Sequence, residues 1–250
     1  MNEPIALVPT MGALHAGHGE LIRRARELSS KVVVSIFVNP LQFENPNDLE
    51  SYPRDLSSDR EKALAAGASE VWAPSFEDIY PGKINKILAG EVGEKFEGRH
   101  RPGHFDGMLT AVSRLFDLVQ PTYAIFGEKD FQQLFIVKKW VSENKIPVGI
   151  IPVAIIREAD GLALSSRNIR LSQSDRKSAL VVNRALRSDT QEEMLRTLAT
   201  EPDFELDYAQ IIDEETFEVA LPDTERPRGI IAGWINGIRL LDNMPMGVAR

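Results

Sequence analysis

The sequence predicts an α/β protein, in which a parallel sheet covered by helices on both faces is followed by a smaller α+β domain. Two observations support this prediction. Short apolar runs rich in β-branched residues alternate with longer stretches whose apolar residues recur at helical spacing, which is typical of βαβ units. The pattern changes after about residue 172, where a helical stretch precedes two strand-like runs around an Asn-Gly turn.

The elements follow in order from the N-terminal end. Residues 5–9 (IALVP) form a short apolar run, read as a strand buried on both faces and closed by proline. The stretch 19–28 places leucine, isoleucine and alanine on one helical face. The same reasoning predicts further strands at 31–39, 70–74, 123–127 and 148–156, and further helices at 56–68, 104–119 and 130–144. Ser174 is the predicted N-cap of a helix near the start of the C-terminal part.

The chain therefore divides into a Rossmann-like domain over residues 1–156 and a smaller α+β domain over residues 157–250. In open parallel sheets, ligands bind beyond the carboxyl ends of the strands. The unusual local sequences lie at such strand ends: PTMGALHAGH, NPLQF, GEKD and READGLALSSRN. We expect these segments to converge on one crevice.

Composition excludes several classes of protein. The 250 residues include no cysteine, which rules out a disulfide scaffold, a thiolate zinc site and a cysteine nucleophile. The formal net charge of −8 argues against a general nucleic-acid binder. No run approaches the roughly 18 apolar residues of a membrane span, and the first residues lack the features of a signal peptide. We expect a cytoplasmic protein with neither nucleic acid nor membrane as a partner.

His15 and His18 stand where an apolar strand passes through a glycine-containing turn into a helix. Backbone N–H groups at such a helix start attract phosphate, and Gly12 and Gly17 would allow a close approach. Imidazoles placed there can donate hydrogen bonds to phosphate oxygens as charge develops. The alternatives are two surface histidines or a partial metal site, although no third strong zinc ligand is obvious.

Two further segments contain groups that suit a phosphorylated ligand. In GEKDFQQ, Lys129 can reach a phosphate and Asp130 can cap a helix or bind a ribose hydroxyl. In LSSRN, two hydroxyls and Arg167 follow a turn and could close over phosphates. The alternatives are a capped helix start with solvated charges for the first segment and a polar interdomain loop for the second.

Uncharged amides and a local basic cluster mark two other segments. Asn39 and Gln42 in FVNPLQF suit a small ligand with hydroxyls and a carboxylate, whereas turn chemistry around a proline explains Asn39 alone. Arg101 and His104 lie in EGRHRPGHFDG, whose basicity would attract an anionic substrate. The alternative for this second segment is a flexible surface loop.

Taken together, these motifs resemble one family. PTMGALHAGH is similar to the HIGH-type signature of the nucleotidyltransferase superfamily that includes class I aminoacyl-tRNA synthetases, and LALSSRN looks like the counterpart of its KMSKS loop. With SIFVNPLQF, YPRDLSSD, RPGHFDGM, FGEKDFQQL, READGLALSSRN and the late RLLDN, the chain resembles the pantothenate synthetase (pantoate–β-alanine ligase) family. The similarity runs in order from about residue 5 to residue 168.

The resemblance implies a reaction and its participants. Pantoate would be activated by ATP and Mg²⁺ to pantoyl adenylate with release of pyrophosphate. The amine of β-alanine would then attack the adenylate, giving pantothenate and AMP. The first domain would bind nucleotide and pantoate, the second would carry the SSRN phosphate clamp, and the protein would be a homodimer.

The resemblance also implies roles for individual residues. His15, His18, Lys129 and Arg167 would be catalytic. The ATP site would comprise Met11, Gly12, Ala13, Leu14, His15, Ala16, Gly17, His18, Gly127, Glu128, Lys129, Asp130, Ile156, Leu164, Ser165, Ser166 and Arg167. Pantoate would be bound by Gln42 and Gln133 with support from Asn39, and Arg101 and His104 would line the substrate pocket.

The sequence departs from the family pattern in two places. Family members usually carry a longer segment before the first strand, so the helix that normally packs there is expected to be missing. They also tend to have adjacent acidic residues after YPR that are associated with Mg²⁺, where Ser58 precedes Asp59 here. Asp59 is therefore the predicted metal ligand, and the alternative is that Mg²⁺ has no direct protein ligand and uses its waters and the substrate phosphates. Two other functions remain open: a nucleotidyltransferase that uses no amine, and a nucleotide-binding relative that has lost turnover.

Overall fold

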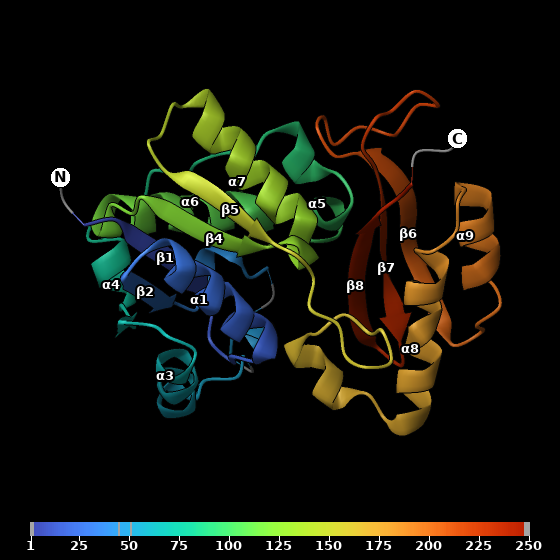
Figure 1. The fold of residues 1–250 in the computed structure, drawn as a ribbon, viewed down its shortest axis with the longest axis horizontal. Helices are drawn as coiled ribbons and strands as arrows, with labels where there is room; N and C mark the ends of the chain where they lie inside the picture. Colours follow the sequence, from blue (N-terminus) through green and yellow to red (C-terminus); the bar gives the residue numbers. More distant parts are fainter. Residues whose placement is uncertain (1–2, 45, 51, 248–250) are drawn as a thin grey trace. The chain divides into compact units, whose positions relative to one another are not determined.

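The computed structural model describes residues 3–44, 46–50 and 52–247, which form two compact units (Figure 1). The first unit comprises Met1–Glu128 and Gln132–Ala154, and the second comprises Lys129–Phe131 and Ile155–Arg250. Each unit has its own sheet and its own hydrophobic core. The short segment Lys129–Phe131 therefore belongs to the second unit, although the chain on either side of it belongs to the first.

The first unit is built on a parallel sheet, as predicted. Its strands are β1 (Ile5–Thr10), β2 (Lys31–Ile36), β3 (Glu70–Trp72), β4 (Tyr123–Gly127) and β5 (Gly149–Val153), in the order β3-β2-β1-β4-β5. Strand order reverses between β1 and β4, which lie side by side with Ala6 opposite Tyr123 and Leu7 opposite Ala124. The carboxyl ends of these two strands thus form the switch point at which sheets of this kind bind ligands.

Helices cover both faces of this sheet, which confirms the prediction (Figure 1). Ala6 and Val8 of β1 pack in one core with Ile22 and Ala25 of α1 (Ala16–Leu28). Leu7 points to the opposite face because side chains alternate along a strand, and α6 (His104–Val119) contacts β1 there. The remaining helices are α2 (Pro46–Glu50), α3 (Leu56–Ala65), α4 (Phe76–Ile79), α5 (Glu97–His100) and α7 (Phe131–Glu143), with 3₁₀ turns at Pro40–Gln42, Glu91–Glu94 and Glu128–Asp130.

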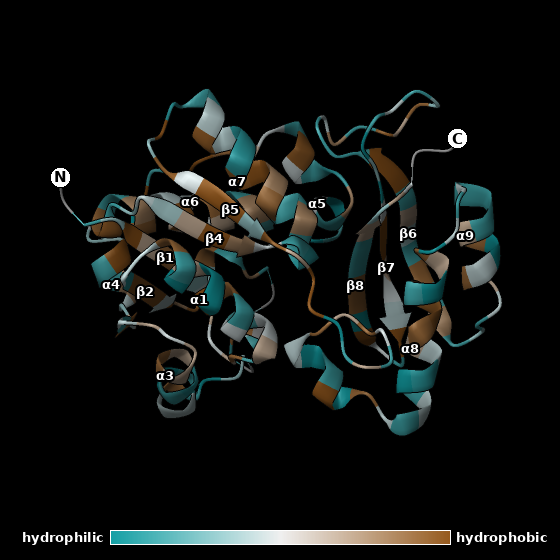
Figure 2. Cartoon of the chain, in the orientation of Figure 1, coloured by the Kyte–Doolittle hydropathy of each residue, from teal (hydrophilic) through white to brown (hydrophobic). Residues whose placement is uncertain are grey.

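The second unit is an antiparallel sheet packed against two helices. Strands β6 (Phe204–Asp213), β7 (Pro227–Ile235) and β8 (Ile238–Pro245) lie in that order, and α8 (Gln173–Ala185) and α9 (Gln191–Leu198) contribute to its core. Asn236 and Gly237 join β7 to β8 with φ values of 47° and 71°. Both positive values fit the two-residue turn that the Asn-Gly pair predicts. Figure 2 shows that β7 is largely hydrophobic, whereas α9 mixes hydrophobic and hydrophilic residues.

The structure corrects three details of the prediction. Helix α1 begins at Ala16, so His18 lies in its first turn and not before it. Strand β6 was not predicted. The N-cap of α8 is Ser172 and not Ser174, because only Ser172 has an acidic residue three positions later: the Asp175 N–H donates to Ser172 Oγ at 3.1 Å, and the Ser172 N–H donates to Asp175 Oδ2 at 3.1 Å.

Over the described residues, none of the helices combines the length and the apolar character that crossing a membrane requires.

Candidate active site

The loop after β1 is held in place by a buried carboxylate. Asp59, on α3 and only 2% exposed, accepts the Ala13 N–H at 2.8 Å and the Leu14 N–H at 2.7 Å. Gly12 has φ +86°, and a Cβ built on it would lie 2.8 Å from Asp59 Oδ2. The loop therefore needs glycine at this position, and two of the N–H groups expected to face a phosphate are bound to Asp59 instead.

His15 and His18 cap helix α1 with their own rings. His15 is the N-cap, and its Nδ1 accepts the Gly17 N–H at 3.1 Å, while His18 Nδ1 accepts the His15 N–H at 3.3 Å. A nitrogen that accepts an N–H carries no proton, so each neutral ring is protonated at Nε2. The two rings lie 4.2 Å apart between centroids and are partly exposed. At the helix start, where free backbone N–H groups were expected, the His15 and Gly17 N–H groups are thus bound by the two rings.

The predicted substrate-binding amides Asn39 and Gln42 lie together. Asn39, 1% exposed, donates from Nδ2 to the Gly107 carbonyl at 2.9 Å and to Gln42 Oε1 at 3.2 Å. The Tyr80 hydroxyl donates to Asn39 Oδ1 at 3.2 Å. Burial raises the pKa of Tyr80 to about 12, so its hydroxyl remains a donor at neutral pH. Asn39 is a support within this cluster, and Tyr80 is a member that the sequence analysis did not identify.

His104 and Arg101 support the Gln42 backbone. His104 Nδ1 lies 2.8 Å from the Gln42 carbonyl oxygen, and His104 Nε2 lies 3.2 Å from Arg101 Nη1. Because the carbonyl only accepts and the guanidinium only donates, His104 donates from Nδ1 and accepts at Nε2. His104 is 7% exposed. These contacts orient Gln42, whose own Nε2 lies 2.8 Å from the sulfur of Met11.

The two neighbouring glutamines at the start of α7 have different surroundings. Gln132 is 8% exposed, accepts the Glu97 N–H at 3.1 Å and donates to the carbonyls of Val92 and Lys95 at 2.7 and 2.8 Å. Gln133, the predicted pantoate ligand, is partly exposed. The sequence alone does not distinguish them, because their difference arises from contacts with the distant segment 92–97. Gly127 and Glu128 precede them, at the end of β4 and in the following turn.

The second unit brings Lys129, Ser165 and Arg167 together around one hollow. These are three of the residues for which phosphate or nucleotide contacts are predicted. The remaining lining residues are Leu162, Ala163, Asn168, Val182, Arg239, Leu240, Leu241 and Asp242. Lys129 Nζ lies 3.6 Å from the exposed carboxylate of Asp130, and the Lys129 side chain is 22% exposed. The three positively charged side chains outnumber the one carboxylate of the lining, Asp242, which is paired with Arg157, so the hollow suits an anionic group.

The segment that carries Ser165 and Arg167 begins with a tight reversal. The Leu164 N–H donates to the Ile156 carbonyl at 2.9 Å, which places the two residues predicted near adenine opposite each other. Gly161, with φ +96°, makes the turn between them. After this turn, Ser165 caps the 3₁₀ helix Ser166–Arg170 by accepting the Arg167 N–H at 3.3 Å. Arg167 is exposed.

Ion pairs fix the base of this segment to α8. Arg176 contacts Glu158 at 2.6 Å and Asp160 at 2.7 Å. The hydrogen bond from Arg176 holds the pKa of Glu158 below its usual range. Asn168, next to Arg167, donates to Glu158 Oε1 at 2.8 Å and to the Ala163 carbonyl at 3.0 Å. These contacts therefore stabilise the turn that carries the hydroxyls of Ser165 and Ser166 and the guanidinium of Arg167.

Within the described residues, no three histidine, aspartate or glutamate side chains lie close enough together to hold a metal ion. Asp59, the predicted magnesium ligand, already uses a lone pair on each of its oxygens for the loop after β1. The contacts of Asp59 therefore give it a structural role in the loop, and its role as a magnesium ligand remains a prediction.

Comparison with known proteins gives a consistent result. A profile of the family Pantoate-beta-alanine ligase matches residues 1–245. The chain is 45% identical to a pantothenate synthetase of Acidothermus cellulolyticus over 98% of this chain and 86% of that protein. It is 44% identical to the enzyme of that name in Marinobacter nauticus, with coverages of 97% and 92%.

Two solved structures are similar along nearly the whole chain. A pantothenate synthetase from Thermus thermophilus has a TM-score of 0.90 at 42% identity, covering 97% of this chain and 93% of that one. A pantoate-beta-alanine ligase from Francisella tularensis, in complex with beta-gamma ATP and beta-alanine, has a TM-score of 0.83 at 37% identity, with coverages of 99% and 92%.

Proposed function

The chain belongs to the pantoate–β-alanine ligase family, and from this premise we propose that it condenses pantoate with β-alanine through a pantoyl-adenylate intermediate. ATP supplies the AMP group, and pyrophosphate and AMP are released. The observation in the structure that most supports this proposal is the gathering of Lys129, Ser165 and Arg167 around one hollow, because the chemistry requires a site for a polyphosphate.

In the first step, a carboxylate oxygen of pantoate attacks the α-phosphorus of ATP, and the bond from that phosphorus to pyrophosphate breaks. The nucleophile is already ionised, so no protein base is needed for this step. The requirement is in-line positioning and neutralisation of the charge that develops on the phosphate oxygens. His15 and His18 contribute Nε2–H donors, and Lys129 and Arg167 contribute positive charge.

Pantoate is a small hydroxy acid, and the amide cluster suits it. Gln42 and Gln133 bind its hydroxyl and carboxylate groups, and Asn39, Arg101 and His104 hold Gln42 in position. Uncharged amides bind a carboxylate without ion pairing that would weaken it as a nucleophile. Pantoate that is bound by these amides can therefore still attack the α-phosphorus of ATP through its carboxylate.

In the second step, the neutral amine of β-alanine attacks the acyl carbon of the adenylate, AMP leaves with the bridging oxygen, and the amine loses a proton. The adenylate is prone to hydrolysis, so water must be excluded until the amine arrives. The segment Ser165–Arg167 closes over the phosphates in this role. On the nucleotide, Asp130 binds the ribose, and Ile156 and Leu164 lie beside the adenine.

Magnesium would enter with ATP and would neutralise charge on its phosphates. The geometry of Asp59 supports a role in holding the loop after β1.

A product assay tests this function. Purified protein is incubated with ATP, Mg²⁺ and pantoate, with and without β-alanine, and pyrophosphate, AMP and ADP are measured separately. We expect pyrophosphate to depend on pantoate, and multiple turnovers of AMP only when β-alanine is present. A nucleotidyltransferase that uses no amine would release no AMP on addition of β-alanine, and an inactive relative would bind ATP without releasing pyrophosphate.

A further inference from the structure

The segment Lys129–Phe131 is the only part of the region around β4 and α7 that is assigned to the second unit in the described structure. It carries the lysine to which the proposed function gives a phosphate contact. Its flanking residues, Glu128 and Gln132, belong to the first unit. The contacts that hold this segment therefore decide where the ammonium group of Lys129 is presented.

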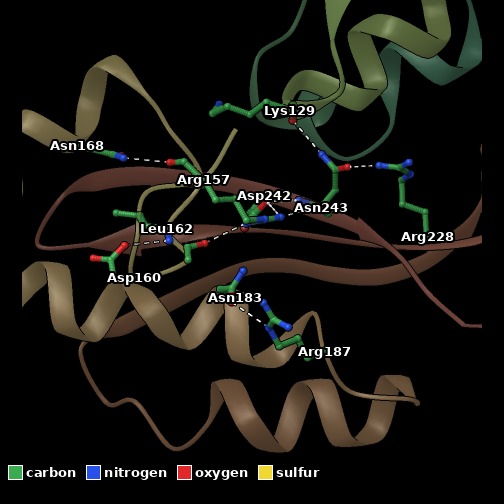
Figure 3. A network of polar contacts seen from close by, with 12 residues as sticks. Lys129, Arg157, Asp160, Leu162, Asn168, Asn183, Arg187, Arg228, Asp242 and Asn243 are labelled. Atoms are coloured by element: carbon green, nitrogen blue, oxygen red, sulfur yellow. Dashed lines mark hydrogen bonds and ion pairs between the residues drawn. The ribbon is translucent and has the colours of Figure 1, made fainter. Parts of the chain in front are cut away.

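Asn243 of β8 binds the segment at its backbone. Its Nδ2 donates to the Lys129 carbonyl oxygen at 2.9 Å, and its Oδ1 accepts from Arg228 Nη1 at 2.5 Å (Figure 3). Because a carbonyl only accepts and a guanidinium only donates, the orientation of the amide is determined. Asn243 is 3% exposed, so losing either contact would leave a polar group buried without that partner.

Arg228 binds the same segment at a second point. Its guanidinium carbon lies 4.1 Å from the centroid of the Phe131 ring, and its Nε donates to Glu214 Oε1 at 2.6 Å. The Phe131 ring also stacks on Phe217, with the ring centroids 6.1 Å apart and an interplanar angle of 18°. Arg228 and Phe217 are 3% and 1% exposed. The segment is thus held at the carbonyl of residue 129 and at the ring of residue 131.

The backbone of Asn243 is itself fixed by a partly buried ion pair. Arg157 contacts Asp242 through two hydrogen bonds of 2.7 and 3.0 Å, and its Nη2 also donates to the Asn243 carbonyl at 3.2 Å (Figure 3). Asp242 in turn lines the hollow that contains Lys129 and Arg167. A rigid support of this kind lowers the entropy lost when a side chain is held against a ligand.

We propose that Asn243 is a positioning residue for Lys129: its amide fixes the Lys129 backbone so that the ammonium group is presented to the phosphates of the nucleotide. This inference rests on the proposed function for the role of Lys129. The Asn243 amide donates to the Lys129 carbonyl and accepts from Arg228 at the same time, which neither a carboxylate nor an aliphatic side chain can do. The sequence motif RLLDN ends at Asn243, so this inference gives a role to a motif residue for which the sequence alone predicted none.

The test compares two identical substitutions in the second unit. N243D keeps the acceptor for Arg228 but replaces the donor to the Lys129 carbonyl with an oxygen. N183D is the matched control: Asn183, on α8 and 7% exposed, accepts from Arg187 Nε at 3.1 Å. We measure the Kd for ATP with Mg²⁺ by calorimetry and the rate of pantoate-dependent pyrophosphate release, below the unfolding temperature of every variant. We expect N243D to weaken binding or slow release by about 10- to 100-fold, and N183D to change them by less than about twofold.

A double-mutant cycle with Lys129→Ala separates positioning from general damage. If Asn243 acts through the lysine ammonium, N243D has little further effect on ATP binding once that ammonium is removed. The inference would be overturned if the changes in ATP affinity caused by N243D and by Lys129→Ala multiply in the double variant. Equal kinetics for N243D and N183D would overturn it as well. Should N243D not fold, Asn243→Ala removes the amide donor without adding a charge and takes its place in the cycle.

Failure of the proposed function gives a different result. Wild-type protein that releases no pyrophosphate with pantoate contradicts the ligase assignment. The ATP-binding cycle still decides the role of Asn243 in that case, because it needs no turnover. Activity in the wild type together with additive effects in the cycle would instead preserve the function and overturn the positioning role.

Discussion

At the scale of single residues, the backbone at the start of α1 determines which ring nitrogen of His15 and His18 carries the proton. Each uses Nδ1 to accept a backbone N–H, which leaves the proton on Nε2. The backbone thus selects the Nε2–H tautomer, which suits the proposed stabilisation of phosphate charge.

This arrangement leads to a prediction for His18. We expect His18→Ala to lower pyrophosphate release by about 100-fold or more, because one donor to the developing charge is lost. His18→Asn retains an acceptor that can cap the His15 N–H, so it should lose a similar factor in rate while unfolding near the wild-type temperature. Stopped assays and thermal unfolding measure the two effects.

The control for both variants is His100→Ala, which alters an exposed histidine on α5. Its rate should stay within about twofold of the wild type, as for most surface substitutions. If His18→Asn retains full activity, the role given to the Nε2–H group is wrong.

Sequence reasoning identified most of these side chains but not the contacts that define their roles. Asp59 was singled out as a metal ligand, whereas its hydrogen bonds to Ala13 and Leu14 join residues 46 and 45 positions apart in the chain. Local patterns carry no information on such pairings. For the same reason, Tyr80 and Gln132 could not be recognised as supports of the site from their sequence surroundings.

At the scale of elements, the helix caps show what a short motif does predict. Ser172 and Asp175 form the reciprocal pair that begins α8, and Ser174 lies inside the helix. The acidic residue three positions after Ser172 is a sequence signal for the correct N-cap, so the prediction of Ser174 overlooked information that the sequence contains.

The caps give a second prediction. Ser172→Ala should lower the free energy of unfolding by about 1 kcal/mol, because the Asp175 N–H loses its acceptor. Ser174→Ala, two residues away, should lower it by less than about 0.5 kcal/mol. Chemical denaturation of the two variants measures both values, and a larger loss for Ser174→Ala would contradict the assignment of the cap.

The ion pairs of Arg176 give a third prediction, which concerns pH. The hydrogen bond from Arg176 lowers the pKa of Glu158 from its ordinary value of 4.5 in the folded protein. The folded state therefore binds fewer protons than the unfolded state just below that pH, so the pair contributes stability above it and loses that contribution as the pH falls through the lowered pKa.

The comparison is between wild type and Arg176→Gln, in which the pair is removed. The difference in their unfolding temperatures should be largest near pH 7 and should shrink as the pH falls below about 4.5. A difference that grows on acidification would show that Arg176 does not stabilise the ionised form of Glu158.

At the scale of the whole chain, the regular alternation of short apolar strands with helices made the first unit predictable. The second unit lacks this alternation and was less predictable. Strands such as Tyr123–Gly127 are short apolar runs that differ clearly from the adjoining helices. Strand β6 has a register shift between Leu206 and Tyr208 and a mixed burial pattern, so it lacks the alternation that identifies a half-buried strand. The assignment of Lys129–Phe131 to the second unit depends on contacts with residues more than 80 positions away, and no local signal reports it.

The homodimer, the cytoplasmic location and the absence of nucleic-acid partners remain predictions. The family assignment does not depend on them, since it rests on similarity along nearly the whole chain.

The central claim is that pantoate is activated as an acyl adenylate. The most direct measurement supplies pantoate with heavy oxygen in its carboxylate, together with ATP, Mg²⁺ and β-alanine, and determines the label in the products by mass spectrometry. The attacking oxygen bonds to the α-phosphorus and leaves with it, so the account predicts AMP that carries one heavy oxygen atom. Unlabelled AMP, or label in inorganic phosphate accompanied by ADP, would contradict the account.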